Sequence, residues 1–274
     1  MKIRNSEAVH PFIRNLFHEL HIFSIQGLTM SAEQSFTACI EAIQYEDGEK
    51  IELDSIFPEL EVKAKYFLAS SLQIPLYFLI FQSGNYFIYV VECSPAPSWK
   101  LVLVLDESKF IGWWKSIKSQ KQTKPVYEAS VRISDSIFDN VLKKHNLAWG
   151  GNIDGFMFKE KTFACVIENI FTNKNPLNSP KGEPSAYFHT KGPNYNTWLP
   201  TVKLAEKLKV PLFLFTVQGN NQQEKIGFAV IKSLSPDNIH YINGISPDKN
   251  ILEGKEAIIN CINSNIKSSP PRIE

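Results

Sequence analysis

The feature that most constrains the fold of this chain is an internal repeat. An apolar segment that contains a glycine begins at Ile25 and is followed shortly by a second apolar segment, Phe36 to Ile43. The same pair of segments recurs from Ile153 and from Phe163, as IQGLTM with FTACIEAI in the first half and IDGFMF with FACVIENI in the second. A repeat on this scale predicts two copies of one supersecondary unit.

The agreement between the halves continues downstream. In each half an amphipathic stretch leads through a proline into an apolar segment that ends in glutamine, a pattern typical of a helix followed by a strand. The matching sequences are KYFLASSLQIPLYFLIFQ from Lys65 and VKLAEKLKVPLFLFTVQ from Val202. A further strand follows in each half, YFIYVVE or IGFAVIK, and amphipathic segments open and close each half, from Pro11 and Phe110 and from Ile137 and Ala257.

These patterns predict an α/β protein made of two tandem α-β-β-α-β-β-α modules, each around a central mixed sheet. The polar stretch that begins at Ser119 contains a proline and separates the halves. We therefore expect a first copy over residues 1–120, a linker over 121–130, a second copy over 131–268 and a tail over 269–274.

Composition excludes several classes of protein. The chain is 43% hydrophobic, which is too high for a disordered protein, and it contains no apolar run near the roughly 18 residues that a membrane span needs. The first residues lack the apolar core of a secretory signal. The four cysteines form no CxxC pair, so we expect free thiols, a reducing compartment, a cytoplasmic location and no membrane partner.

Two carboxylates stand out when the halves are aligned. Asp154 opens the first strand of the second hairpin and Glu168 closes its second strand, and a hairpin brings such ends side by side, about 5 Å apart. Carboxylates held so closely repel each other unless a cation lies between them, and oxygen ligands suit Mg²⁺ or Mn²⁺. A nearby lysine could stabilise negative charge on phosphorus, and Lys174 and then Lys203 are the candidates.

This order of residues resembles the PD-(D/E)xK nucleases, whose fold is restriction-endonuclease-like. The resemblance lies in NIDGF from Asn152, ACVIENIFTNK from Ala164, NTWLPTVKLA from Asn196 and VPLFLF from Val210, and it covers most of residues 135–232. It implies metal binding by Asp154 and Glu168, with an assisting lysine, and hydrolysis of phosphodiester bonds in nucleic acid. The chain departs from the pattern at Ile170, which occupies the usual lysine position.

A long polar stretch between Glu168 and the next helix would emerge beside this pair. Loops of this length and composition suit contacts with phosphates and bases, and the balance of charge is basic in residues 130–274. We therefore expect nucleic acid, DNA rather than RNA, as the partner. Asn169 and Asn173 are candidate supports of the metal site, and Lys181, Lys191 and Tyr195 are candidate substrate contacts.

The first half serves as an internal comparison. It has Glu41 opposite Glu168 but Gln26 opposite Asp154, and glutamine is a weak ligand for a hard cation. We expect a degenerate copy that forms an intramolecular pseudo-dimer with the second. Taken singly, an aspartate before glycine is typical of turns and a glutamate at a strand end is often solvated. The alternative is thus a non-catalytic nucleic-acid- or protein-binding module built from two pseudo-nuclease copies.

Overall fold

The computed structural model of the chain describes most of its residues. The described ranges are 11–16, 21–118, 137–147, 150–159, 162–172, 193–220, 223–234, 239–245 and 251–266. The described residues fall into two compact units: those within 25–152 form one, and residues 11–16, 21–24 and those within 153–266 form the other. The expected linker 121–130 and tail 269–274 lie outside the described residues.

The first unit contains a mixed β-sheet with strand order β1-β2-β3-β4-β5. β1 and β2 pair antiparallel, β2 and β3 pair parallel, and the remaining neighbours pair antiparallel. The parallel step requires a crossover, which α2 supplies. The elements of this part of the chain are β1 (Ile22–Met30), β2 (Phe36–Gln44), the 3-10 turn η1 (Leu53–Ser55), α2 (Glu59–Leu72), β3 (Leu76–Gln82), β4 (Asn85–Cys93), β5 (Pro97–Leu105), α3 (Glu107–Lys118) and α4 (Ile137–Lys144).

The second unit repeats the same strand directions. β6 and β7 pair antiparallel, β7 and β8 pair parallel across the α5 crossover, and β8, β9 and β10 follow antiparallel. Its elements are α1 (Pro11–Leu16), β6 (Gly151–Lys159), β7 (Thr162–Thr172), α5 (Pro193–Leu208), β8 (Leu212–Asn220), β9 (Gln223–Leu234), β10 (Ile239–Ile245) and α6 (Ile251–Asn265). The predicted α/β class with a mixed sheet is confirmed.

The strand count differs from the expected module. Each sheet has one strand more than α-β-β-α-β-β-α allows, namely β5 in the first unit and β10 in the second. β5 contains the apolar run Leu101 to Leu105, and β10 is a short strand that follows β9 closely in the chain. Both extra strands pair antiparallel with the strand before them, as expected of a simple hairpin extension.

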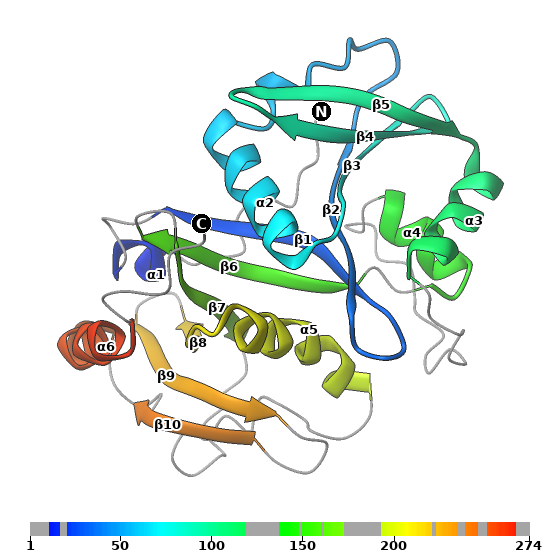
Figure 1. The fold of residues 1–274 in the computed structure, drawn as a ribbon. Helices are drawn as coiled ribbons and strands as arrows, with labels where there is room; N and C mark the ends of the chain where they lie inside the picture. The colour runs from blue at the N-terminus through cyan, green and yellow to red at the C-terminus, as the bar shows by residue number, and fades with distance from the viewer. Residues whose placement is uncertain are drawn as a thin grey trace. The chain divides into compact units, whose positions relative to one another are not determined.

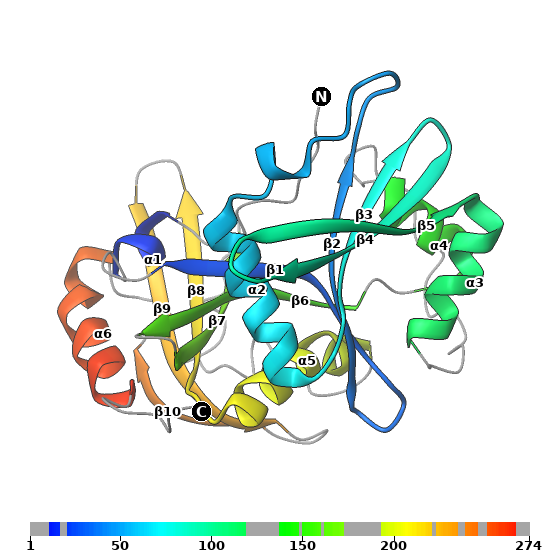
Figure 2. The same cartoon turned by 45° about the horizontal axis from the view of Figure 1, so that its top comes forward.

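In the first unit, helices cover both faces of the sheet. α2 lies on one side of β2 and β3, and α3 and α4 lie on the other, in both views (Figures 1 and 2). Successive strand residues point to opposite faces, so Ile40 and Ala42 of β2 enter the core with α3 and α4 while Glu41 between them faces α2. The second unit follows the same rule: Ile167 of β7 packs in the core with α1 and α6, and Glu168 faces α5.

The opening helices are exchanged between the units. Ile13 and Leu16 of α1 are buried in the core of the second unit, against residues of β7, β8, β9 and α6. Phe138 of α4 is buried in the core of the first unit, where its ring lies 5.8 Å from Tyr86 and 6.1 Å from Phe110. Each sheet is therefore covered by the helix that precedes the strands of the other half.

This exchange gives a first prediction. Phe138→Ala should lower the free energy of unfolding by about 3–5 kcal/mol, because it leaves a cavity among buried aromatic rings. Native-state hydrogen exchange would locate the loss. We expect faster amide exchange in β2, β3 and β4, although residue 138 belongs to the second half of the sequence. Faster amide exchange confined to β7, β8 and β9 would contradict the placement of α4 in the first unit.

Candidate functional site

Asp154 and Glu168 come together at the open end of the β6–β7 hairpin. Gly155 pairs with Ile167 in the antiparallel ladder, which places Asp154 and Glu168 opposite each other one step further out. Both side chains are buried, and their carboxyl groups are in hydrogen-bonding contact. The local sequence explains the arrangement, since the buried apolar residues Ile153 and Ile167 directly precede the two acids and fix both strands in the core.

Neutral donors hold the two carboxyl groups in place. The backbone N–H of Asn169 and its side-chain Nδ2 both donate to Oδ2 of Asp154, at 2.9 and 2.7 Å. Thr201, on the face of α5 that covers the sheet, donates through Oγ1 to Oε2 of Glu168 at 3.0 Å. Each acid therefore has a defined orientation, but these donors supply no positive charge.

The electrostatics follow from burial and from the proximity of the two acids. Burial raises the pKa of Glu168 well above its ordinary value, the negative charge of Asp154 raises it further, and the Thr201 hydroxyl opposes the shift. Burial also raises the pKa of Asp154, against the hydrogen bonds from Asn169. Both shifts favour a proton on the pair over two charged carboxylates. A bound cation would neutralise the two carboxylates in place of that proton.

Of the two predicted lysines the structure describes only Lys203, and it separates this one from the pair. Lys203 is half-exposed and forms an ion pair with Glu206 at 2.8 Å. It follows Thr201 by two positions, which on a helix turns it to a different face from the one that meets Glu168. Lys174, Lys181, Lys191 and Asn173 lie outside the described residues, and Tyr195 lies in α5 without a described side chain.

The first unit has a different set of groups at the corresponding strand positions. Gly27 pairs with Ile40, which places Gln26 opposite Glu41. The backbone N–H of Gln26 donates to Oε1 of Glu41 at 3.2 Å. The Gln26 side-chain oxygen accepts from the backbone N–H of Ala42, as the Asp154 side chain accepts from that of Asn169. This side-chain to backbone contact is thus the same in both units, with a neutral amide in place of the aspartate.

A buried lysine neutralises the acid of the first unit. Nζ of Lys65, on α2, lies 2.8 Å from Oε2 of Glu41 and 2.6 Å from Oε1 of Glu61. The Lys65 side chain is 0% exposed and that of Glu41 is 1% exposed. Burying ions in this way costs much solvation energy, which only close pairing offsets.

Thr201 is the residue that sequence reasoning missed. Lys65 precedes Pro75 by the same number of residues as Thr201 precedes Pro211, so the repeated helix–proline–strand pattern aligns the two. That alignment could have identified both residues from the sequence. The first unit therefore has an ammonium group where the second has a hydroxyl, and the second has an additional carboxylate.

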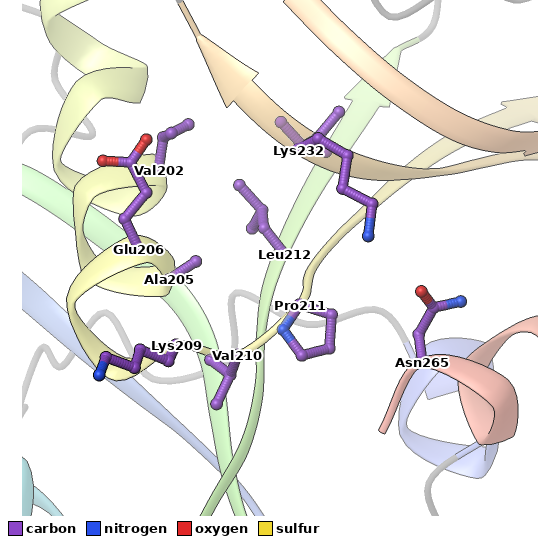
Figure 3. A pocket seen from close by; sticks show the side chains of 10 residues that line it. Val202, Ala205, Glu206, Lys209, Val210, Pro211, Leu212, Lys232 and Asn265 are labelled. Carbon is purple, nitrogen blue, oxygen red and sulfur yellow. The ribbon is translucent and has the colours of Figure 1, made fainter. Parts of the chain in front are cut away.

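A separate pocket lies beside α5 in the second unit, and Figure 3 shows its walls. It has a volume of about 260 Å³ and an apolar wall that includes Val202, Ala205 and Leu212. Lys232 from β9 and Asn265 from α6 line the side opposite α5 (Figure 3). Neither Asp154 nor Glu168 lines this pocket, so the carboxylate pair and the pocket are distinct features.

Comparison with known proteins adds no identification: no protein family, curated protein or solved structure matches this chain. Two further absences concern the described residues alone. No helix there is long and apolar enough to cross a membrane. No group of three or more histidine, cysteine, aspartate or glutamate side chains placed to hold a metal ion occurs there either.

The raised pKa values predict an unusual dependence of stability on pH in the absence of divalent ions. Below the ordinary glutamate pKa of 4.5 the folded and unfolded states both hold the proton of Glu168. As the pH rises above that value, the unfolded chain loses the proton and the folded pair retains it, so the free energy of unfolding falls until the pH passes the raised pKa. Chemical denaturation across this range measures the effect.

Glu168→Gln should remove most of that fall, because the amide carries no titrating proton. Glu92→Gln is the matched control, since Glu92 is exposed on β4. Profiles that fall with pH equally in wild type and Glu168→Gln would show that the pair does not hold the proton.

The buried lysine gives a third prediction. Lys65→Met should lower the free energy of unfolding by about 3–5 kcal/mol, because it removes the ammonium group that lies against the buried Glu41 carboxylate. Adding Glu41→Gln should recover a large part of the loss, since the variant then buries one unpaired charge fewer. Urea denaturation of the single and double variants tests this coupling, and strictly additive effects would contradict it.

Proposed function

We propose that the two units are copies of one module and that the C-terminal copy is a divalent-cation-dependent nuclease. One observation carries the proposal. At matching strand positions, the first unit pairs a buried glutamate with an ammonium group, whereas the second places an aspartate beside it and orients the two acids with the neutral donors Asn169 and Thr201. A cation bound between Asp154 and Glu168 would restore the balance that Lys65 gives the first unit.

The residues fit Mg²⁺ or Mn²⁺. These ions prefer oxygen ligands and are commonly held by one or two carboxylates together with substrate phosphate and water. The pair offers two carboxylates, and the Asn169 amide and the Thr201 hydroxyl fix their orientation in the way that outer hydrogen bonds do at metal sites. Soft sulfur ligands are absent from these contacts, which favours a hard cation.

Phosphodiester hydrolysis is the reaction that this site suits. A divalent ion polarises a phosphoryl oxygen and lowers the pKa of bound water. Asp154 and Glu168 would hold the ion, while Asn169 and Thr201 keep the two acids aligned. The resemblance of NIDGF and ACVIENIFTNK to PD-(D/E)xK nucleases supports the same assignment and implies nucleic acid as the substrate, for which we propose DNA rather than RNA. Lys181, Lys191 and Tyr195 remain proposed substrate contacts.

The assisting lysine of this proposal is Lys174. Lys203 is less suitable, because it pairs with Glu206 and lies two positions from the residue that faces Glu168. Thr201 itself cannot supply a positive charge, although it occupies the position of Lys65. Charge stabilisation during the reaction therefore has to come from the segment that follows β7.

A second candidate, a non-catalytic nucleic-acid-binding module, is favoured by one specific observation. Among the described residues neither unit combines an aspartate, a glutamate and a lysine in one contact network: the first has Glu41 with Lys65, and the second has Asp154 with Glu168. In this alternative the second unit binds nucleic acid without cleaving it.

The test combines cation binding with cleavage of labelled DNA in the full chain. We expect Mn²⁺ to raise the melting temperature of the wild type, since a ligand that binds only the folded state stabilises it. Asp154→Asn and Glu168→Gln should weaken cation binding at least about tenfold and reduce cleavage by roughly a hundredfold or more.

Two further variants sharpen this test. Thr201→Lys would introduce the ammonium of the first unit beside Glu168, and it should abolish the stabilisation by Mn²⁺. Lys203→Ala is the matched change on the same helix and should leave cation binding unchanged. Cation-dependent cleavage that survives Asp154→Asn and Glu168→Gln would refute the assignment. Cation binding with salt-dependent DNA binding but without cleavage would favour the second candidate.

A further inference from the structure

β5 is the outer strand of the first unit and carries an exposed apolar run. It is last in the strand order of its sheet, so one of its edges has no neighbouring strand within that unit (Figures 1 and 2). Four consecutive residues are large, apolar and exposed: Leu101 is 45% exposed, Val102 38%, Leu103 39% and Val104 51%. Exposed side chains at successive positions mean that both faces of the strand are uncovered here.

The two ends of β5 differ in how they are held. At the N-terminal end Trp99 packs edge-on against Phe78, with ring centroids 4.7 Å apart, and its indole N–H donates to Asp54 at 2.6 Å. The run that follows lacks such a cover, and a bulge interrupts its pairing with β4 opposite Ile88 and Tyr89. The exposed run is therefore part of an ordered strand, paired on one edge.

Natural edge strands of this kind are usually short, charged or covered, because unpaired backbone groups and apolar side chains attract another strand. β5 has nine residues, and a single basic residue, Lys100, precedes its apolar run. A strand that exposes apolar residues on both faces and one free edge is typical of a site that another β-strand completes.

The charges at the two ends of this apolar run favour a second copy of the same strand as the partner. Lys100 comes directly before the apolar residues, and Asp106 follows them after Leu105. The Asp106 carboxylate accepts the backbone N–H of Lys109 and lies 3.5 Å from its ammonium group, but its side chain is 55% exposed and accessible to a second basic group. When two such strands lie antiparallel, the basic end of each meets the acidic end of the other and the apolar residues meet apolar residues. A parallel arrangement would place Lys100 beside Lys100 and Asp106 beside Asp106. The segment is thus complementary to itself in one orientation.

We propose that β5 is the docking edge for a second copy of this chain, which pairs through its own β5 in antiparallel orientation. The contact is isologous, so the same residues contribute from both copies. It would join two first-unit sheets edge to edge, satisfy the outward backbone groups of both strands and cover part of the exposed run. This interface is independent of the carboxylate pair of the second unit.

The oligomeric state of the full chain tests the proposal. Sedimentation equilibrium over a range of concentrations should give a species of twice the 31.2 kDa chain mass that dissociates on dilution. Val104→Lys should raise the dimer dissociation constant at least about tenfold, because each substitution appears twice in an isologous contact and places charge within an apolar strand pair. Lys100→Glu should also weaken the dimer, because the new carboxylate would lie opposite Asp106 of the other copy.

A matched control separates the edge from general effects of added charge. Leu60→Lys changes an apolar residue that is 53% exposed on α2, away from β5, and should leave the dimer intact. Thermal unfolding of both lysine variants should match the wild-type monomer, which excludes misfolding as the cause. A chain that is monomeric at every concentration would overturn the proposal. So would a dimer that Leu60→Lys weakens as much as Val104→Lys.

Discussion

The interaction on which the rest of this structure depends is the neutralisation of a glutamate buried between a sheet and its crossover helix. Glu41 and Glu168 occupy this position in the two units, and neither can reach bulk water. A charge in such a place must be paired, protonated or bound to a cation. The first unit pairs it with Lys65, held in turn by Glu61, and the second places Asp154 beside it. The corresponding strand position therefore holds a buried ion pair with a lysine in one unit and a pair of adjacent carboxyl groups in the other.

The scaffold explains why this position exists twice. A hairpin followed by a parallel strand requires a helix to cross one face of the sheet, so one residue of the second hairpin strand must face that helix. In each unit the helix–proline–strand connection sets which helical residue meets it, Lys65 before Pro75 and Thr201 before Pro211. The helical residue is a lysine in the first unit and a threonine in the second, and this one difference changes the charge beside the buried glutamate. The side chains of Gln26 and Asp154 nevertheless accept the same backbone N–H bond.

Much of the local structure could be predicted from the sequence because it depends on short-range patterns. Two apolar segments joined by a short polar turn in each half predict a hairpin, and the hairpin then brings Asp154 to Glu168. The long-range features could not be predicted in this way. The segment around Phe138 has the pattern of an amphipathic helix, but the pattern does not show which strands the helix packs against. The placement of α1 and α4 in opposite units therefore could not be predicted. β5 was missed because its apolar run lacks the polar alternation of a half-buried strand, having no buried face at Leu101 to Val104.

The most direct measurement of the central claim is a crystal structure of the full chain grown with Mn²⁺, with anomalous scattering used to locate the ions. The account predicts an anomalous peak between the carboxylates of Asp154 and Glu168, and no peak beside Gln26 and Glu41, where Lys65 already supplies the positive charge. An empty acidic pair, with its two carboxyl groups still in hydrogen-bonding contact at saturating Mn²⁺, would contradict it.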